Sequence, residues 1–139
     1  TISRRQRQMC IRDSPKSEYL TSKLENGTYS MYHQQYQMAL KLFTDIIKED
    51  PKWAEGWNKR ATLLFIMGNY EKSLDDIEKV LDLEPRHFGA LSGRAQIYLS
   101  YKQYEKAIDD LRKAKSIYPL IKSGENIRLI EKIIKEQQI

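Results

Sequence analysis

Residues 51–84, PKWAEGWNKRATLLFIMGNYEKSLDDIEKVLDLE, are followed by residues 85–118, PRHFGALSGRAQIYLSYKQYEKAIDDLRKAKSIY, and the two segments repeat one another. Prolines at 51, 85 and 119 recur at intervals of 34 residues, and the aligned segments share nine identical positions. The identical pairs are Pro51/Pro85, Arg60/Arg94, Ala61/Ala95, Tyr70/Tyr104, Glu71/Glu105, Lys72/Lys106, Asp75/Asp109, Asp76/Asp110 and Lys79/Lys113. A repeat of this length is typical of helical arrays, in which each unit buries its apolar face only by stacking on its neighbours.

The pattern inside each repeat predicts two helices joined by a tight turn. Trp57, Ala61 and Leu64 recur at spacings of three and four residues, so they share one face of a first helix. Gly68 suits a left-handed helix end, and Asn69 is expected to cap the next helix through its side chain. The proline that follows each second helix ends it. We therefore expect helices at 53–67, 70–83, 87–100 and 104–117.

Small residues and charged pairs have expected positions on these helices. The small residues that fall where two helices must approach closely are Ala61, Ser73, Ala95, Ala107 and Ala114. The oppositely charged pairs at a spacing of four are Lys72/Asp76, Asp75/Lys79, Lys106/Asp110 and Asp109/Lys113. We interpret these charges as a solvated convex face. Neighbouring aspartates diverge by about 100° around a helix, so they do not form catalytic carboxylate pairs.

These residues resemble the tetratricopeptide repeat (TPR) pattern in three places. The matching residues are Trp57, Ala61, Gly68, Tyr70, Ser73, Ile77, Val80 and Pro85, then Ala95, Tyr98, Tyr104, Ala107, Leu111, Ala114 and Pro119, and more loosely Gly27, Tyr36, Ala39, Phe43, Ile46 and Pro51. The sequence of these repeats is similar to that of small bacterial TPR proteins, which are often exported. The resemblance implies an all-α, right-handed solenoid of helical hairpins. It predicts a degenerate unit at 17–51, further units at 52–85 and 86–119, and a capping helix within 120–139.

The two ends of the chain differ from the repeats. Residues 3–14 resemble translated sequencing-adapter read-through, and we expect residues 1–14 to be a disordered, non-native tail. The alternative is a basic arm for nucleic acid or anionic lipid. At the other end Ser123 is expected to cap a helix, and its apolar stripe would contain Ile127, Leu129, Ile130, Ile133 and Ile134. The alternative there is the first half of a truncated fourth repeat.

Charge and composition exclude several classes of function. The chain has a net charge of +5, and residues 1–14 supply +3 of it, which leaves +2 for the other 125 residues. The pI of about 9.2 therefore reflects the tail, and a nearly balanced body predicts no nucleic-acid partner. No apolar run approaches the length of a membrane span. The sequence contains no intact signal peptide and assigns no compartment, although a signal peptide upstream of Pro15 would indicate export.

The inventory of reactive residues is short. Cys10 is the single cysteine, which excludes an internal disulfide and a cysteine-based zinc site. His33 and His87 lie in different repeats, and we expect both to be structural. The sequence has no phosphate loop, dinucleotide fingerprint or nucleophile elbow. We therefore expect no enzymatic activity, no cofactor, no metal and no small-molecule substrate.

The TPR resemblance implies that the first helices line a concave groove that binds a partner protein or an extended peptide. The groove residues mapped by spacing, with those at the rim, are Trp53, Glu55, Asn58, Thr62, Phe65, Ile66, Arg86, Gly89, Ser92, Gln96 and Leu99. The corresponding residues of the first unit are Thr21, Leu24, Thr28, Met31 and Tyr32. Amide and hydroxyl groups suit a peptide backbone, and apolar residues suit its side chains. The alternative is that Phe65 and Leu99 pack between repeats.

One known use of TPR domains can be compared with these positions. Chaperone-binding TPR domains hold a C-terminal carboxylate with lysine and asparagine side chains, but the matching positions here are Leu24, Thr28, Gly89 and Gly93, and only Lys59 offers a cation. A chaperone-tail role is therefore not expected. The sequence favours a non-enzymatic scaffold that binds a protein or peptide. The alternative is a structural or oligomerisation array that packs on other domains of a longer chain.

Overall fold

The structure is a computed structural model that describes residues 15–120 and 124–138. These ranges contain seven helices and no strand. The helices are α2 (Pro15–Tyr32), α3 (Tyr36–Glu49), α4 (Ala54–Ile66), α5 (Tyr70–Leu83), α6 (Phe88–Ser100), α7 (Tyr104–Ile117) and α8 (Gly124–Gln137). The predicted all-α helical-hairpin solenoid is therefore confirmed. The predictions for the tail, for Cys10 and for the Ser123 cap lie outside the described residues.

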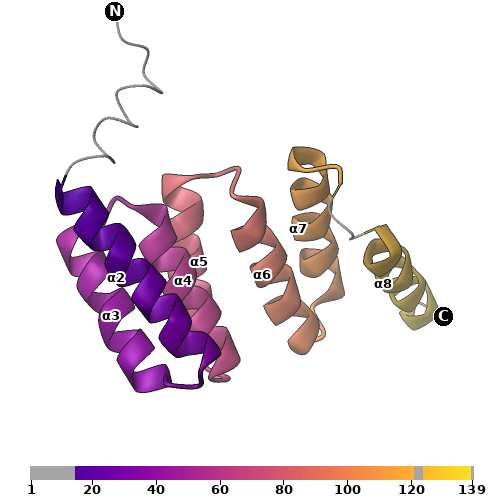
Figure 1. Cartoon of the computed structure of the whole chain (residues 1–139). Coiled ribbons are helices and arrows are strands. Elements are labelled where there is room, and N and C mark those ends of the chain that lie inside the picture. The colour runs from indigo at the N-terminus through magenta and orange to yellow at the C-terminus, as the bar shows by residue number, and fades with distance from the viewer. Residues whose placement is uncertain (1–14, 121–123, 139) are drawn as a thin grey trace, which may run out of the picture.

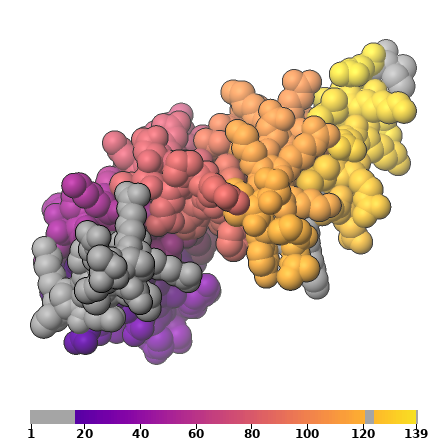
Figure 2. Space-filling model, turned by 90° about the horizontal axis from the view of Figure 1, so that it is seen from above, coloured from indigo at the N-terminus to yellow at the C-terminus, as the bar shows by residue number. Residues whose placement is uncertain are grey.

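The hairpins α2–α3, α4–α5 and α6–α7 stack one after another, and α8 packs on α7 at the end of the stack (Figure 1). Seen from above, the hairpins follow one another along an elongated body (Figure 2). The first helices meet, because α2 contacts α4 and α4 contacts α6, whereas the described parts of α3, α5 and α7 do not contact one another. A helical stack curves towards the side where its helices approach one another, so we call the side lined by α2, α4 and α6 the concave face.

Three clusters of buried residues hold the stack together, centred on the first, second and third hairpins. The small residues expected at close helix contacts are all at most 2% exposed: Ala61, Ser73, Ala95, Ala107 and Ala114. In one of these contacts the Ser73 hydroxyl donates to the carbonyl oxygen of Ala61 at 2.7 Å. The prediction that these positions are buried between helices is therefore confirmed.

The three hairpin turns share one geometry although their sequences differ. Gly68 has the predicted left-handed conformation, with φ of +81°, and Gln34 and Lys102 occupy the same region with φ near 60°. The side-chain cap predicted for Asn69 is wrong, since that side chain makes no capping hydrogen bond. Instead, the Asn69 amide donates to the Leu64 carbonyl at 2.8 Å, and the other two turns have the same backbone bond. Backbone bonding and helix packing therefore set the turn.

The placement of Asp76 and Asp110 on a solvated convex face is also wrong. Asp76 is 4% exposed and Asp110 is 3% exposed. Arg60 binds Asp76 through two nitrogens at 2.8 and 2.9 Å, and Arg94 binds Asp110 in the same way at 2.7 Å. The hydrogen bonds to Asp110 raise the pKa of Arg94. These arginines reach across the hairpin and form paired bonds to the carboxylates, which is the stronger geometry for such a pair.

Helix α8 buries a narrower stripe than predicted. Ile127 and Ile130 are 8% and 3% exposed and pack in the third cluster, whereas Leu129 is 58% exposed. An ion pair of 2.6 Å between Arg112 Nη2 and Glu131 Oε1 also joins α7 to α8 at the surface. The helix therefore packs on α7 mainly through these two isoleucines and this ion pair.

Candidate functional site

A pocket of about 110 Å³ lies between α4 and α6 on the concave face. Its floor consists of buried residues: Ala61, Ser73, Ile77 and Ala90. Its more exposed rim consists of Asn58, Thr62, Phe65, Gly89, Gly93 and Gln96. The fold thus brings together five of the residues that spacing assigned to the groove: Asn58, Thr62, Phe65, Gly89 and Gln96.

The pocket is neutral, and the hydroxyl groups in it are already bonded. The Ser73 hydroxyl donates to the Ala61 carbonyl at 2.7 Å, and the Thr62 hydroxyl donates to the Asn58 carbonyl at 3.0 Å. The carboxamides of Asn58 and Gln96 have no hydrogen-bond partner within the described residues. The arrangement is an apolar hollow with two available amide groups at its edge, as in many sites that bind organic ligands or peptides.

The two glycines of the rim have different local roles. A Cβ atom at Gly89 would lie 3.2 Å from Cε1 of His87, so this glycine makes room for the histidine ring. A Cβ atom at Gly93 would meet only Cδ1 of Ile77, at the ordinary contact distance of 3.8 Å. The absence of a side chain at Gly93 therefore leaves space in the pocket that the packing of the fold does not require.

A hydrogen-bonded histidine links α4 and α6 beside the pocket. The backbone amide of Ala90 donates to Nδ1 of His87 at 3.0 Å, which caps α6. Since Nδ1 accepts this bond, Nε2 carries the proton and donates to Oε1 of Glu55 at 3.1 Å. This contact raises the pKa of His87 and lowers the pKa of Glu55, in both cases chiefly through the hydrogen bond.

Sequence reasoning placed Glu55 in the groove but missed its partner. His87 lies two residues after Pro85, at the start of the first helix of its repeat, and this position was the available signal for a capping side chain. The other histidine, His33, stacks on Tyr29 with 3.8 Å between the ring centroids. Both histidines therefore have structural contacts, as the sequence predicted.

The remaining predicted groove residues lie outside the pocket. Trp53 packs against the first core cluster, and Leu99 packs against the third, which is the alternative considered for Leu99. Arg86 is exposed in the turn before α6, and Ile66 is 44% exposed at the end of α4. Ser92 as a whole is half-buried, but its hydroxyl oxygen is buried and has no hydrogen-bond partner among the described residues.

Neighbouring aromatic rings extend from the pocket towards the hairpin turns. Phe65 packs against the second core cluster and also lines the pocket, so both readings of this residue apply. Its ring lies 5.2 Å from that of Tyr70, which in turn lies 6.1 Å from that of Tyr101. In the first unit, Met31 is 3% exposed and belongs to the core, so it does not line a groove.

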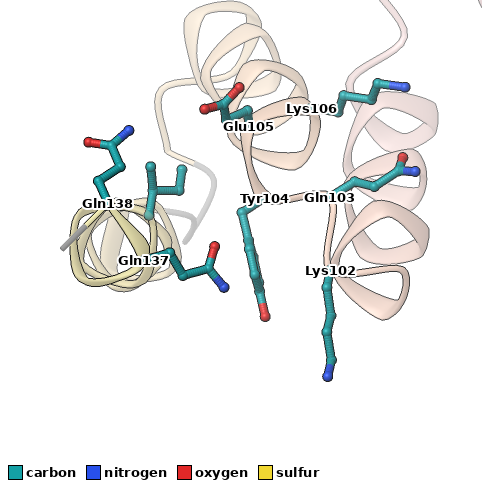
Figure 3. Close-up of a pocket in the computed structure, with 8 residues that line it drawn as sticks. Lys102, Gln103, Tyr104, Glu105, Lys106, Gln137 and Gln138 are labelled. Atoms are coloured by element: carbon teal, nitrogen blue, oxygen red, sulfur yellow. The ribbon is translucent and has the colours of Figure 1, made fainter.

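A second hollow, of about 380 Å³, lies between the α6–α7 turn and the end of α8 (Figure 3). Lys102 and Lys106 extend away from each other there, and Gln137 points towards Tyr104 (Figure 3). The polar groups do not converge on one point, so we assign no site to this hollow. The described residues include no cluster of histidine, cysteine, aspartate or glutamate suited to a metal ion. None of the described helices is long and apolar enough to cross a membrane.

Comparisons with known protein sequences find matches to tetratricopeptide repeats. The tetratricopeptide repeat pattern matches residues 54–87 and again residues 89–119. A TPR repeat-containing protein of Rhizobium etli is 60% identical over 53 residues, which cover 38% of this chain and 26% of that protein. Hsp70-Hsp90 organizing protein 1 of Glycine max is 33% identical over 75 residues, which cover 50% of this chain and 13% of that protein. The chain thus spans a small part of these relatives.

Solved structures share the arrangement of helices. The first TPR of Spaghetti (RPAP3), bound to an HSP90 peptide, superposes with a TM-score of 0.79 at 19% identity and covers 86% of this chain and 95% of that one. The Sgt2 TPR domain from Aspergillus fumigatus gives a TM-score of 0.77 at 20% identity, with coverage of 90% and 83%. At this level of identity the likeness concerns the fold.

Proposed function

Because this chain belongs to the tetratricopeptide repeat family, we propose that it binds an extended segment of a partner protein in the groove between α4 and α6. The repeats of this family are in general non-enzymatic protein-interaction modules. The observation that carries the proposal is the pocket on the concave face, where Asn58 and Gln96 present carboxamides on opposite walls.

The two carboxamides suit a peptide backbone. Each carries one acceptor oxygen and two donor protons, so each can bond to a peptide N–H or C=O group. An extended peptide offers such groups on both sides of its chain, and its side chains alternate in direction. A segment that runs between α4 and α6 would therefore meet one amide from each wall while a side chain enters the pocket.

The chemistry of the pocket favours an internal peptide segment over a chain terminus. The Glycine max relative is named for Hsp70 and Hsp90, and the RPAP3 domain was solved with an HSP90 peptide. The pocket lining here contains no charged residue, so a terminal carboxylate would gain no ion pair in it. The lining also contains no titratable group that could serve as a general acid or base, and the proposed role is binding alone.

A selection from a displayed library of random peptides tests the proposal. We expect the wild-type protein to enrich a family of peptides, and the double variant Asn58→Ala with Gln96→Ala to bind them about tenfold more weakly, since two hydrogen bonds are lost. Asp75→Ala with Asp109→Ala is the matched control, because both side chains are exposed on second helices. The buried Asp76 and Asp110 are unsuitable as controls.

The contradicting outcome concerns the same two variants. If the folded groove variant retains every selected peptide while the control variant loses them, the site is on the convex face. The array would then have the structural role that is the alternative to groove binding. Circular dichroism of both variants would show that each is as helical as the wild type.

A further inference from the structure

The geometry of the pocket also points to the class of side chain that occupies it. We infer that the pocket receives one aliphatic side chain of the bound segment, of valine to leucine size, and excludes aromatic and charged side chains. The inference rests on the proposed peptide binding and specifies what the bound segment must contain.

The size of the pocket sets the upper limit. Its volume is about 110 Å³. A protein cavity of roughly 150 Å³ holds a benzene molecule, so the ring of a phenylalanine would not fit here without displacement of the walls. The floor residues Ala61 and Ala90 belong to packed helices and are 2% and 1% exposed, which leaves the walls little freedom to move. A branched chain of three or four carbons matches the space.

The polarity of the pocket excludes charged side chains. The floor holds one side-chain oxygen, that of Ser73, and it is already bonded to the Ala61 carbonyl. A charged group in this position would lose its hydration and find no partner of opposite charge among the lining residues. A water molecule in the floor would also find few hydrogen-bond partners, so an apolar side chain replaces it readily.

Gly93 sets the depth of the pocket. A glycine inside a helix weakens that helix relative to alanine, and the backbone here does not need the left-handed region. An alanine methyl at this position would touch only Cδ1 of Ile77, at 3.8 Å, and would occupy space that the ligand needs. Gly93 is therefore the residue that determines which side chain the pocket accepts.

A nuclear magnetic resonance titration of the full chain tests the inference without knowledge of the partner. The probe is N-acetyl-leucine methylamide, and the comparison probes are the phenylalanine and glutamate analogues. We expect the leucine probe to shift the backbone amides of Ala61, Gly89 and Gly93, and the other two probes to leave them unchanged. The variant Gly93→Ala should bind the leucine probe at least about tenfold more weakly while it melts at or above the wild-type temperature.

The matched control is Gly124→Ala, another glycine-to-alanine change on a helix far from the pocket, next to the flexible end of Lys115. It should bind the leucine probe as the wild type does. The inference is overturned if the phenylalanine or glutamate probe shifts the same amides equally, if Gly93→Ala retains leucine binding, or if leucine produces no shift at any attainable concentration.

Failure of the inference is distinguishable from failure of the proposed function. If selected peptides depend on Asn58 and Gln96 but contain no common aliphatic position, and bind Gly93→Ala as tightly as wild type, the groove remains the site and the inference is wrong. If the library yields no peptide that depends on Asn58 and Gln96, peptide binding in the groove and the inference fail together.

Discussion

The joint between α2 and α4 and the joint between α4 and α6 distribute side-chain volume differently. At the first joint the Phe43 ring is fully buried against Gly27, where a Cβ atom would lie 2.6 Å from the ring. At the second joint the residues 34 positions later are Ile77 and Ala61, and a pocket opens beside them. The comparison indicates that a hollow opens between repeats when a smaller residue replaces the one that fills it.

The side chains on the inner walls of the two joints also differ in size and in charge. The residues that correspond to Gly89 and Gly93 at the first joint are Glu55 and Lys59, which have long charged side chains. Glu55 is also held by the hydrogen bond from His87. The first joint is thus packed and charged, whereas the second is hollow and neutral.

The hairpins also differ in what joins their two helices. The second and third hairpins each contain a buried ion pair, Arg60 with Asp76 and Arg94 with Asp110. The corresponding residues of the first hairpin are Asn26 and Leu42, which cannot form such a pair.

The largest expected effect follows from this ion pair. Arg60→Ala would leave the Asp76 carboxylate, whose side chain is 6% exposed, without its partner. We expect a loss of about 3 kcal/mol in the free energy of unfolding, measured by denaturant titration. Replacement of both residues by apolar ones, Arg60→Met with Asp76→Leu, should cost less than Arg60→Ala alone. Equal stability of Arg60→Ala and wild type would show that the pair does not hold the second hairpin.

The next-largest loss of stability is expected from a substitution at the tightly packed first joint. Gly27→Ala places a methyl group 2.6 Å from Cε1 of Phe43, whose side chain is fully buried. We expect overpacking to cost about 2 kcal/mol in the same titration. The double variant Gly27→Ala with Phe43→Leu should recover part of that loss. An unchanged denaturation midpoint for Gly27→Ala would mean that the first joint is as loosely packed as the second.

A glycine-to-alanine substitution at the second joint should raise the free energy of unfolding instead of lowering it. Gly93→Ala meets no close neighbour, so the higher helix propensity of alanine should raise the unfolding free energy by up to about 1 kcal/mol. Thermal melting of the two variants side by side measures this difference. A destabilised Gly93→Ala variant would show that the glycine is needed for packing, and the contrast between the joints would weaken.

The smallest effect concerns the link between His87 and Glu55. The raised pKa of His87 contributes stability that is present below its ordinary value of 6.5 and is lost as the pH rises through the raised pKa. The lowered pKa of Glu55 contributes stability that is present above its ordinary value of 4.5 and is lost as the pH falls through the lowered pKa. The link should therefore stabilise the second joint most between pH 4.5 and 6.5.

The size of this pH effect should be a few tenths of a kcal/mol, because the Glu55 side chain is 41% exposed. The protonated ring also cannot accept the Ala90 bond, which offsets part of the gain. Melting temperatures at about pH 5.5 and pH 8 should differ more for the wild type than for Glu55→Gln. The same pH dependence in both proteins would exclude this link as its source.

The sequence predicted the helices well because their boundaries depend on local signals. Gly68 and the spaced prolines mark the ends of helices. Much of the same residue pattern recurs 34 residues later, so each helix of the second hairpin predicts one in the third. The turns at Gln34 and Lys102 could not be derived from turn chemistry, since neither has the usual glycine and the backbone bonds of the packed hairpin determine their conformation.

The misplacement of Asp76 and of Leu99 has a common physical cause. Asp76 stands four residues after Lys72, a local spacing that suggests a surface pair, but its partner Arg60 lies sixteen residues earlier on the facing helix. Sequence periodicity describes the faces of one helix at a time, so it does not predict contacts between helices. For the same reason spacing could assign Asn58 and Gln96 to inner faces but could not tell that Leu99 packs into the core.

The most direct test of the account is a map of amide shifts in the wild-type protein on addition of one peptide from the library selection. We predict that the largest shifts occur in α4 and α6 around the pocket, at Asn58, Thr62, Gly89, Gly93 and Gln96. Shifts concentrated on α2 at the first joint, or on the outer helices α5 and α7, would contradict the claim that the hollow second joint is the binding site.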